Sequence, residues 1–124
     1  MGDDIRARVT PLVMDLYKLS GNIPIVPLYN VVTAVIESGP DRLRACIDAT
    51  KHSMNDSGIS SAEIKRITGY PLNKLGILAP QMRGVLEETG RGRDNSIQFK
   101  LTSPPVAISY MQKMRDLIGV LNGS

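Results

Sequence analysis

The stretch SAEIKRITGYPLNKLGILAPQMRGVLEETGRGRDNSIQFKLT, from Ser61 to Thr102, decides the fold. A helix is expected to begin at the start of this stretch, because Glu63 and Ser60, the residue just before the stretch, have the spacing of a capping box. In such a box each of the two side chains satisfies the free backbone N–H of the other residue. Apolar residues follow from Ile64 at helical spacing, and Gly69 is a suitable C-terminal stop. We therefore predict a short helix that begins near residue 61 and ends near residue 68.

The rest of the stretch predicts a second helix and then a β-hairpin. Apolar residues at positions 72, 75, 78 and 82 have the spacing of one helix face, and Gly84 would end that helix. Residues 85–89 then read as a strand, and the glycine-rich run 90–95 reads as a hairpin tip. Residues 96–101 alternate strictly between polar and apolar, which is typical of a half-buried strand. Residues 58–60 can form a short strand edge before the first helix.

Proline marks the starts of the helices expected outside this stretch. Its missing N–H would be unpaired in the first helical turn anyway, so it is well tolerated there. We predict helices that open at Pro11, Pro27, Pro40 and Pro104, the first of which can extend one turn upstream and the last of which runs to about residue 121. Ser38 and Gly39 would stop the second helix before the third begins.

The order helix, corner, helix, strand, basic tip, strand and closing helix resembles the winged helix-turn-helix family of transcription regulators. The resemblance implies a mainly α (α+β) fold with a small β-hairpin wing and a closing C-terminal helix. Residues 40–121 would form the winged-helix domain, and residues 1–39 an N-terminal extension of two helices. It also implies a ligand, double-stranded DNA, whose major groove admits one α-helix. We expect a transcription regulator or an architectural DNA-binding factor.

The cationic residues of this region, together with two amide side chains, are the expected DNA contacts. The net charge of the chain is +3, and residues 60–100 alone hold seven Lys/Arg against four acids. Such a local surplus indicates an anion-binding element on an otherwise neutral body. The second helix would read bases, the hairpin tip would enter the minor groove or grip phosphate, and the first helix would contact the DNA backbone. The corresponding residues are Asn73, Lys74, Gln81 and Arg83, then Arg91 and Arg93, and finally Lys65 and Arg66.

Two features leave alternatives open. Pro80 falls inside the proposed recognition helix, where it would remove one hydrogen bond and cost about 3 kcal/mol. The helix could instead start at Pro80, which would shorten the face offered to the major groove. The acids Glu87, Glu88 and Asp94 lie beside the basic tip. Together these features favour the alternative of a winged helix that contacts protein within a larger assembly.

The last helix carries an apolar seam of coiled-coil type. Ala107, Met111, Met114, Ile118 and Leu121 follow at steps of 4, 3, 4 and 3 residues. We predict a homodimer through the terminal helices, with the last four of these residues at the interface. The alternative is that the stripe packs on the core of its own chain.

Enzymatic chemistry and a cofactor are not expected. The sequence shows no paired carboxylates, no metal-spaced Cys/His cluster and no phosphate-binding loop. Cys46 is the only cysteine and reads as a small buried side chain, and His52 reads as a solvated residue near a helix end. No run approaches the about 18 apolar residues of a membrane span, and the N-terminus is acidic. We expect an intracellular protein, cytoplasmic and nucleoid-associated or nuclear.

Overall fold

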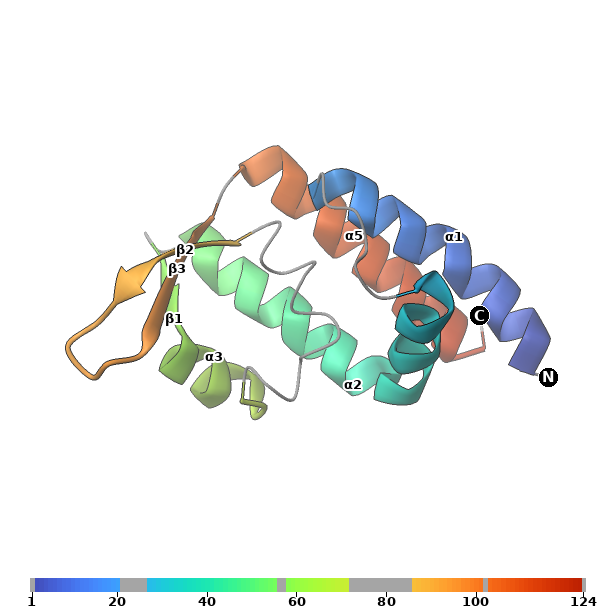
Figure 1. Cartoon of the computed structure of the whole chain (residues 1–124), viewed down its shortest axis with the longest axis horizontal. Coiled ribbons are helices and arrows are strands. Elements are labelled where there is room, and N and C mark those ends of the chain that lie inside the picture. Colours follow the sequence, from blue (N-terminus) through green and yellow to red (C-terminus); the bar gives the residue numbers. More distant parts are fainter. Residues whose placement is uncertain (1, 21–26, 56–57, 72–85, 102, 124) are drawn as a thin grey trace.

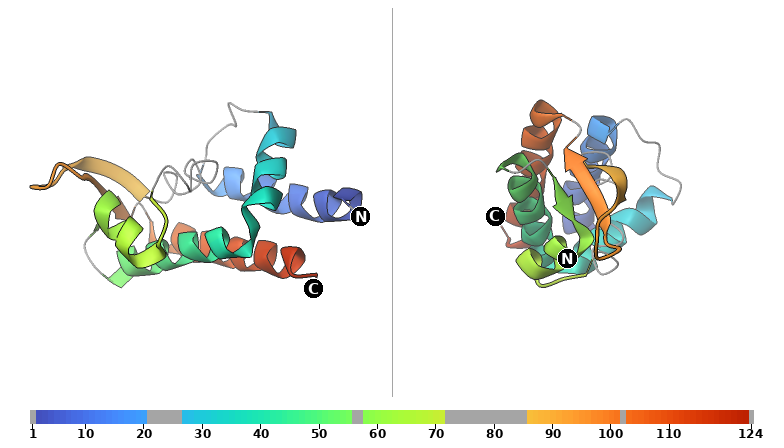
Figure 2. Two further views of the ribbon diagram at one scale, coloured as in Figure 1. Left: turned by 90° about the horizontal axis from the view of Figure 1, so that it is seen from below. Right: turned by 90° about the vertical axis from the view of Figure 1, so that its left-hand side faces the viewer.

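The fold is mainly α with a small three-stranded antiparallel sheet (Figure 1). The computed structural model describes residues 2–20, 27–55, 58–71, 86–101 and 103–123. Three long helices form the body, and the sheet lies with a short helix at the end opposite to the two chain termini (Figures 1 and 2). In chain order the described elements are α1 (Gly2–Ser20), α2 (Leu28–Asn55), β1 (Ile59–Ser60), α3 (Ser61–Thr68), β2 (Leu86–Arg91), β3 (Ile97–Leu101) and α5 (Pro104–Leu121).

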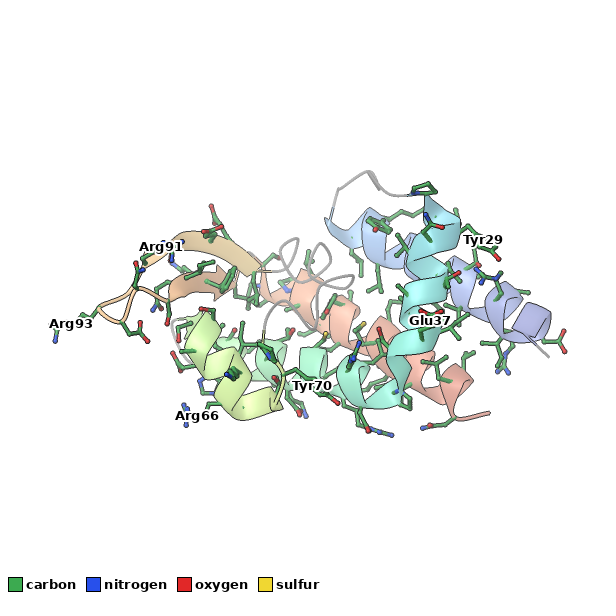
Figure 3. All side chains as sticks on the ribbon, turned by 60° about the horizontal axis from the view of Figure 1, so that its bottom comes forward. Tyr29, Glu37, Arg66, Tyr70, Arg91 and Arg93 are labelled. Carbon is green, nitrogen blue, oxygen red and sulfur yellow. The ribbon has the colours of Figure 1, made fainter. Side chains whose placement is uncertain are left out.

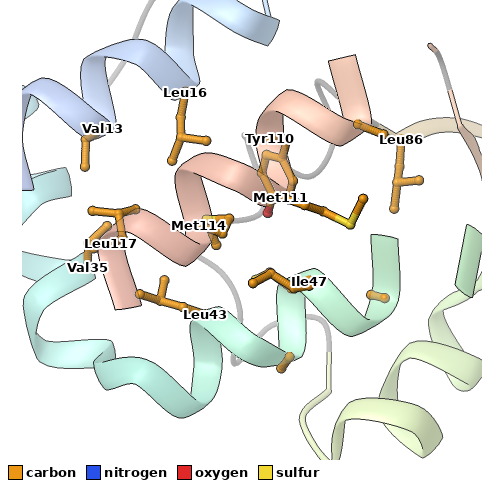
Figure 4. Packing of buried hydrophobic residues seen from close by; sticks show 14 of the residues in the cluster. Val13, Leu16, Val35, Leu43, Ile47, Leu86, Tyr110, Met111, Met114 and Leu117 are labelled. Carbon is orange, nitrogen blue, oxygen red and sulfur yellow. The ribbon is translucent and has the colours of Figure 1, made fainter. Parts of the chain in front are cut away.

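The core lies where α5 packs against both α1 and α2 (Figure 4). Leu16 from α1, Leu43 from α2 and Leu117 from α5 are all buried there. Because the chain has one Phe and no Trp, aliphatic side chains and methionine fill most of this space. Burial of one such side chain contributes about 1.5–3 kcal/mol. An ion pair between Lys113 Nζ and Asp15 Oδ2, 3.1 Å apart, also joins α5 to α1.

Helix α1 begins at Gly2, two turns before the expected start at Pro11, which lies inside the helix. Proline in a helix interior removes one hydrogen bond and clashes with the preceding turn. However, the upstream turns carry Val9, which is buried in the core together with Val13 and Leu16. The apolar surface that these turns bury outweighs the local cost of the exposed proline. The expected start at Pro11 is therefore wrong, and the helix extends upstream by more than the one turn that the sequence left open.

Helix α2 consists of two straight segments that meet at Gly39, and Figure 2 shows the change of direction. Gly39 has φ 77° and ψ 171°, a conformation that is open almost only to glycine. Pro40 then opens the second segment, so the predicted stop and restart are both confirmed. The boundary expected between the N-terminal extension and the winged-helix domain, between residues 39 and 40, falls at this kink. The hydrophobic cluster includes residues from both sides of it.

The local signals around α3 are confirmed in detail. Ser60 Oγ accepts a hydrogen bond from the Glu63 N–H (3.1 Å), and Glu63 Oε1 accepts one from the Ser60 N–H (3.3 Å). At the other end, Gly69 has φ 80° and donates its N–H to the Lys65 carbonyl (2.9 Å). Ile64 is fully buried between these caps. The capping box thus fixes the start of α3, and Gly69 fixes its end.

The sheet has the strand order β1-β3-β2, with both pairs antiparallel. Strands β2 and β3 form the predicted hairpin, in which Leu86 pairs with Leu101. Strand β1 pairs with β3 through Ile59 and Phe99, and both side chains are buried. A bulge between Glu88 and Gly90 shifts the register of β2 toward the tip.

Helix α5 runs over the predicted range, with proline in its first turn. The predicted second helix, and with it the question of Pro80, falls on residues 72–85 and lies outside the described residues. None of the described helices combines the length and the hydrophobicity of a membrane-spanning segment.

Candidate nucleic-acid interface

The tip of the β2–β3 hairpin is a compact loop held by its own backbone. The Gly92 N–H donates to the Ser96 carbonyl (2.9 Å), and the Asn95 N–H donates to the Gly92 carbonyl (3.0 Å). Asn95 has φ 66°, in the left-handed region that asparagine tolerates better than most residues. Figure 3 shows Arg93 at the extremity of the molecule and Arg91 just behind it on the hairpin. The predicted basic tip therefore projects away from the helical body.

The two tip arginines differ in what they contact. Arg91 Nη1 donates a hydrogen bond to the Asn95 carbonyl (2.7 Å). Arg93 is exposed and has no hydrogen bond or ion pair with any described residue. Both side chains face solvent, but only the guanidinium of Arg93 is uncommitted.

Acidic side chains balance the charge of the hairpin. Residues 86–101 hold three cations and three acids, so their formal net charge is zero. Glu87 and Glu88 lie near the base of β2, and Glu87 is in register with Lys100 on β3. The cations at the far end are Arg91 and Arg93. The hairpin is thus polarised, with negative charge toward its base and positive charge toward its tip.

Asp94 is the one acid at the tip itself. Its carboxylate accepts hydrogen bonds from Ser96, including one from the Ser96 N–H at 3.1 Å. These bonds lower the pKa of Asp94 below its ordinary value, since they favour the ionised form. Asp94 therefore stays charged, and its charge is bound back into the loop.

Helix α3 brings two further cations to the same end of the molecule. Lys65 and Arg66 are exposed, and the side chain of neither has a hydrogen bond or ion pair with a described residue. Figure 3 shows Arg66 projecting from α3 on the side away from the hairpin. The structure therefore places α3 and the tip at one end but does not direct Arg66 and Arg93 to one point.

Half of the expected contacts cannot be placed. Asn73, Lys74, Gln81 and Arg83 all lie outside the described residues. The charge surplus of residues 60–100 depends on this part of the chain, because the hairpin is neutral and α3 contributes only one net positive charge. Lys74 and Arg83 supply the remaining two charges.

The apolar seam of α5 faces its own chain. Met111 is 5% exposed and Met114 is fully buried, both within the core shared with α1 and α2 (Figure 4). The assignment of Met111 and Met114 to a dimer interface is therefore corrected, because their side chains already fill the space between the helices. Ile118 and Leu121 are half-buried, and they pack against the edge of the same cluster.

Two contacts between distant segments were not predicted. The guanidinium of Arg6 on α1 lies 3.9 Å from the ring centre of Tyr29 on α2 and donates to Thr33 Oγ1 (2.7 Å). His52 at the end of α2 lies 3.3 Å from Glu63 Oε2 on α3, measured from Nε2. The expectation that His52 is simply solvated is therefore wrong. Partners far apart in the sequence leave no spacing signal, so sequence patterns could not reveal either contact.

Cys46 is a buried core residue, as predicted. Burial raises the pKa of its thiol to about 12, so the nucleophilic thiolate is absent near neutral pH. Tyr110 is also buried, and burial followed by interaction with Cys46 raises the pKa of its phenol well above the ordinary value. The Tyr110 hydroxyl has no well-aligned hydrogen-bond partner among the described residues. Both groups therefore stay protonated near neutral pH.

Metal chemistry and similarity to other proteins give no further guide to the site. Among the described residues, no three or more His, Cys, Asp or Glu side chains gather in a way that could hold a metal ion. No protein-family model, curated protein or solved structure matches the chain.

Proposed function

We propose that the protein binds double-stranded DNA through a winged helix-turn-helix and acts as a transcription regulator or an architectural factor. The observation that carries the proposal is the β2–β3 hairpin, which projects from the body with exposed Arg91 and Arg93 at its tip (Figure 3). A guanidinium presents up to five N–H donors in a planar fork that matches the oxygens of a phosphate. A narrow hairpin also has the shape to reach a groove or a phosphate chain.

The arrangement of the elements supports the same proposal. Helix α3 starts directly after β1, and the hairpin returns from its tip to pair with β1. Helix α5 then closes the chain against α1 and α2. A recognition helix would fall on residues 72–85, between α3 and β2 in the chain. There, Asn73, Lys74, Gln81 and Arg83 would carry the direct contacts to DNA.

The experiment is a salt titration of the intact chain on a duplex of mixed sequence, followed by fluorescence anisotropy. Phosphate contacts release counterions, so the affinity of a DNA-binding protein falls steeply between about 50 and 200 mM salt. We expect this fall for the wild type, and a shallower fall with weaker binding for the double variant Arg91→Ala/Arg93→Ala. The matched control is Lys18→Ala/Arg115→Ala, which removes the same charge from exposed positions on α1 and α5.

Two results would count against the proposal. A wild type that does not bind duplex DNA at 50 mM salt rejects it outright. Equal losses in the tip variant and in the control variant would reject the role of the hairpin, since they would reflect only the net charge of the protein.

A second candidate function is contact with another protein in a larger assembly. The neutrality of residues 86–101 favours it, because a hairpin specialised for phosphate would carry fewer acids than Glu87, Glu88 and Asp94 provide. A mixed-charge hairpin suits a partner surface with both charge signs. Absence of salt-sensitive DNA binding in the titration above would leave this function as the better account.

A further inference from the structure

We infer that the two tip arginines have different tasks: of the two, only Arg93 contacts the phosphates of bound DNA, and Arg91 is a positioning residue that holds the loop in shape. The inference rests on the proposed function, and it assigns contact with DNA to one arginine and stabilisation of the loop to the other. Arg91 and Arg93 are equivalent in the sequence pattern, and only their hydrogen bonds distinguish them.

Hydrogen bonds within the loop order it before any ligand binds. Four hydrogen bonds connect residues 91–96: Gly92 to Ser96, Asn95 to Gly92, Arg91 to Asn95, and Ser96 to the Asp94 carboxylate. A loop that is ordered before binding loses less conformational entropy when it meets its ligand. These hydrogen bonds therefore hold the loop in one conformation. The candidate contact is the Arg93 side chain, which has no partner among the described residues.

The Arg91 side chain takes part in the hydrogen bonds of the loop. Its position in β2 is opposite Ile97 in β3, and its guanidinium reaches forward to the carbonyl of Asn95 at 2.7 Å. Asn95 is the loop residue with positive φ, so a hydrogen bond to its carbonyl stabilises the least favourable backbone conformation of the tip. If Arg91 turned to a phosphate, this bond would be lost.

The Arg93 side chain takes no part in the hydrogen bonds of the loop. It lies beyond Arg91 at the extremity of the hairpin, and no described residue engages its side chain (Figure 3). The neighbouring carboxylate of Asp94 accepts from Ser96 within the loop, so no ion pair with Asp94 withdraws the Arg93 guanidinium. Arg93 can therefore contact a phosphate without breaking an existing interaction.

The test compares matched glutamine variants of the full-length chain. Glutamine removes the charge of each arginine, and its amide nitrogen ends two bonds short of the Nη1 position, so Arg91→Gln weakens the support of the Asn95 carbonyl without removing a phosphate contact. We expect Arg93→Gln to reduce the slope of log affinity against log salt by about 0.9, the value of one lost phosphate contact on B-form DNA. Arg91→Gln should leave that slope unchanged, with an affinity within about threefold of the wild type. Equal slope changes in the two variants would overturn the division of tasks.

A second measurement reads the loop without DNA. Amide hydrogen exchange at Gly92 and Asn95 reports the two backbone bonds of the tip. We expect Arg91→Met, which lacks a donor, to lower their protection by about fivefold, the effect of one lost hydrogen bond. Arg93→Gln should not change it. If Arg91→Met leaves protection unchanged, the positioning role is rejected whether or not DNA binds. If the wild type fails to bind DNA while the exchange result holds, the proposed function and the Arg93 contact fall together and only the support of the loop remains.

Discussion

Gly39 allows the cost of one backbone conformation to be measured almost in isolation. Its φ of 77° and ψ of 171° lie in a region used essentially by glycine, where another residue costs up to about 3 kcal/mol. A Cβ added at Gly39 would meet no atom of another described residue within 4 Å, so substitution adds no steric clash with these groups. Gly69 is the matched control, since it has φ 80° with equally open space but a ψ of 0°. That control conformation is left-handed helical and costs about 1–2 kcal/mol for alanine.

Both substitutions also restrict the unfolded chain, which returns about 0.4–1 kcal/mol of stability. We therefore expect Gly39→Ala to lower the free energy of unfolding by about 2 kcal/mol and Gly69→Ala by about 0.5–1 kcal/mol. For a chain of 124 residues, each kcal/mol corresponds to a shift of about 4 °C in the unfolding midpoint. Asparagine should separate the sites further. It is tolerated in the left-handed helical region, so Gly69→Asn should cost less than Gly69→Ala, whereas Gly39→Asn should be as damaging as Gly39→Ala.

The assay is urea unfolding at 25 °C followed by far-ultraviolet circular dichroism, with the slope against urea compared among the variants. An unchanged slope confirms that a difference in midpoint is a difference in stability. Equal costs at the two glycines, or a Gly39→Ala protein as stable as the wild type, would refute the reasoning. Such a result would mean that the two segments of α2 reach their positions without this backbone conformation.

Three further outcomes are expected. Tyr110→Phe should raise the free energy of unfolding by about 1 kcal/mol, because it removes a buried hydroxyl without a well-aligned partner among the described residues; a loss of stability in thermal unfolding would show that the hydroxyl is satisfied. The raised pKa of Cys46 favours the protonated thiol in the folded state, so the stability it contributes is complete below pH 9 and is lost as pH rises toward 12. Urea titrations across that range should show less loss in Cys46→Ala, and equal losses would contradict the assignment. Ser60→Ala should lower stability by about 1 kcal/mol, since it breaks the capping box of α3; circular dichroism melts in which it equals the exposed control Ser109→Ala would count against that role.

Much of the hairpin and of the helix boundaries could be predicted from neighbouring residues. The Ser60–Glu63 pair, the stop at Gly69 and the alternation of residues 96–101 each depend on positions within five residues of one another. Signals of that range depend only on neighbouring residues, so the pattern alone predicted the start of α3 and the strand β3. The position and charge of the basic tip were likewise readable from the run of glycine and arginine at 90–93.

Tertiary packing decided the rest. Pro11 lies inside α1 because the turns before it bury Val9 in the core, and the length of this extension, more than the one turn that the sequence allowed, depends on that packing. The seam of α5 has the same spacing whether Met111 and Met114 face a second copy or their own chain, and contact with α1 and α2 settles the choice. A sequence pattern records which faces are apolar but not which surface covers them, because that depends on elements brought together from distant parts of the chain.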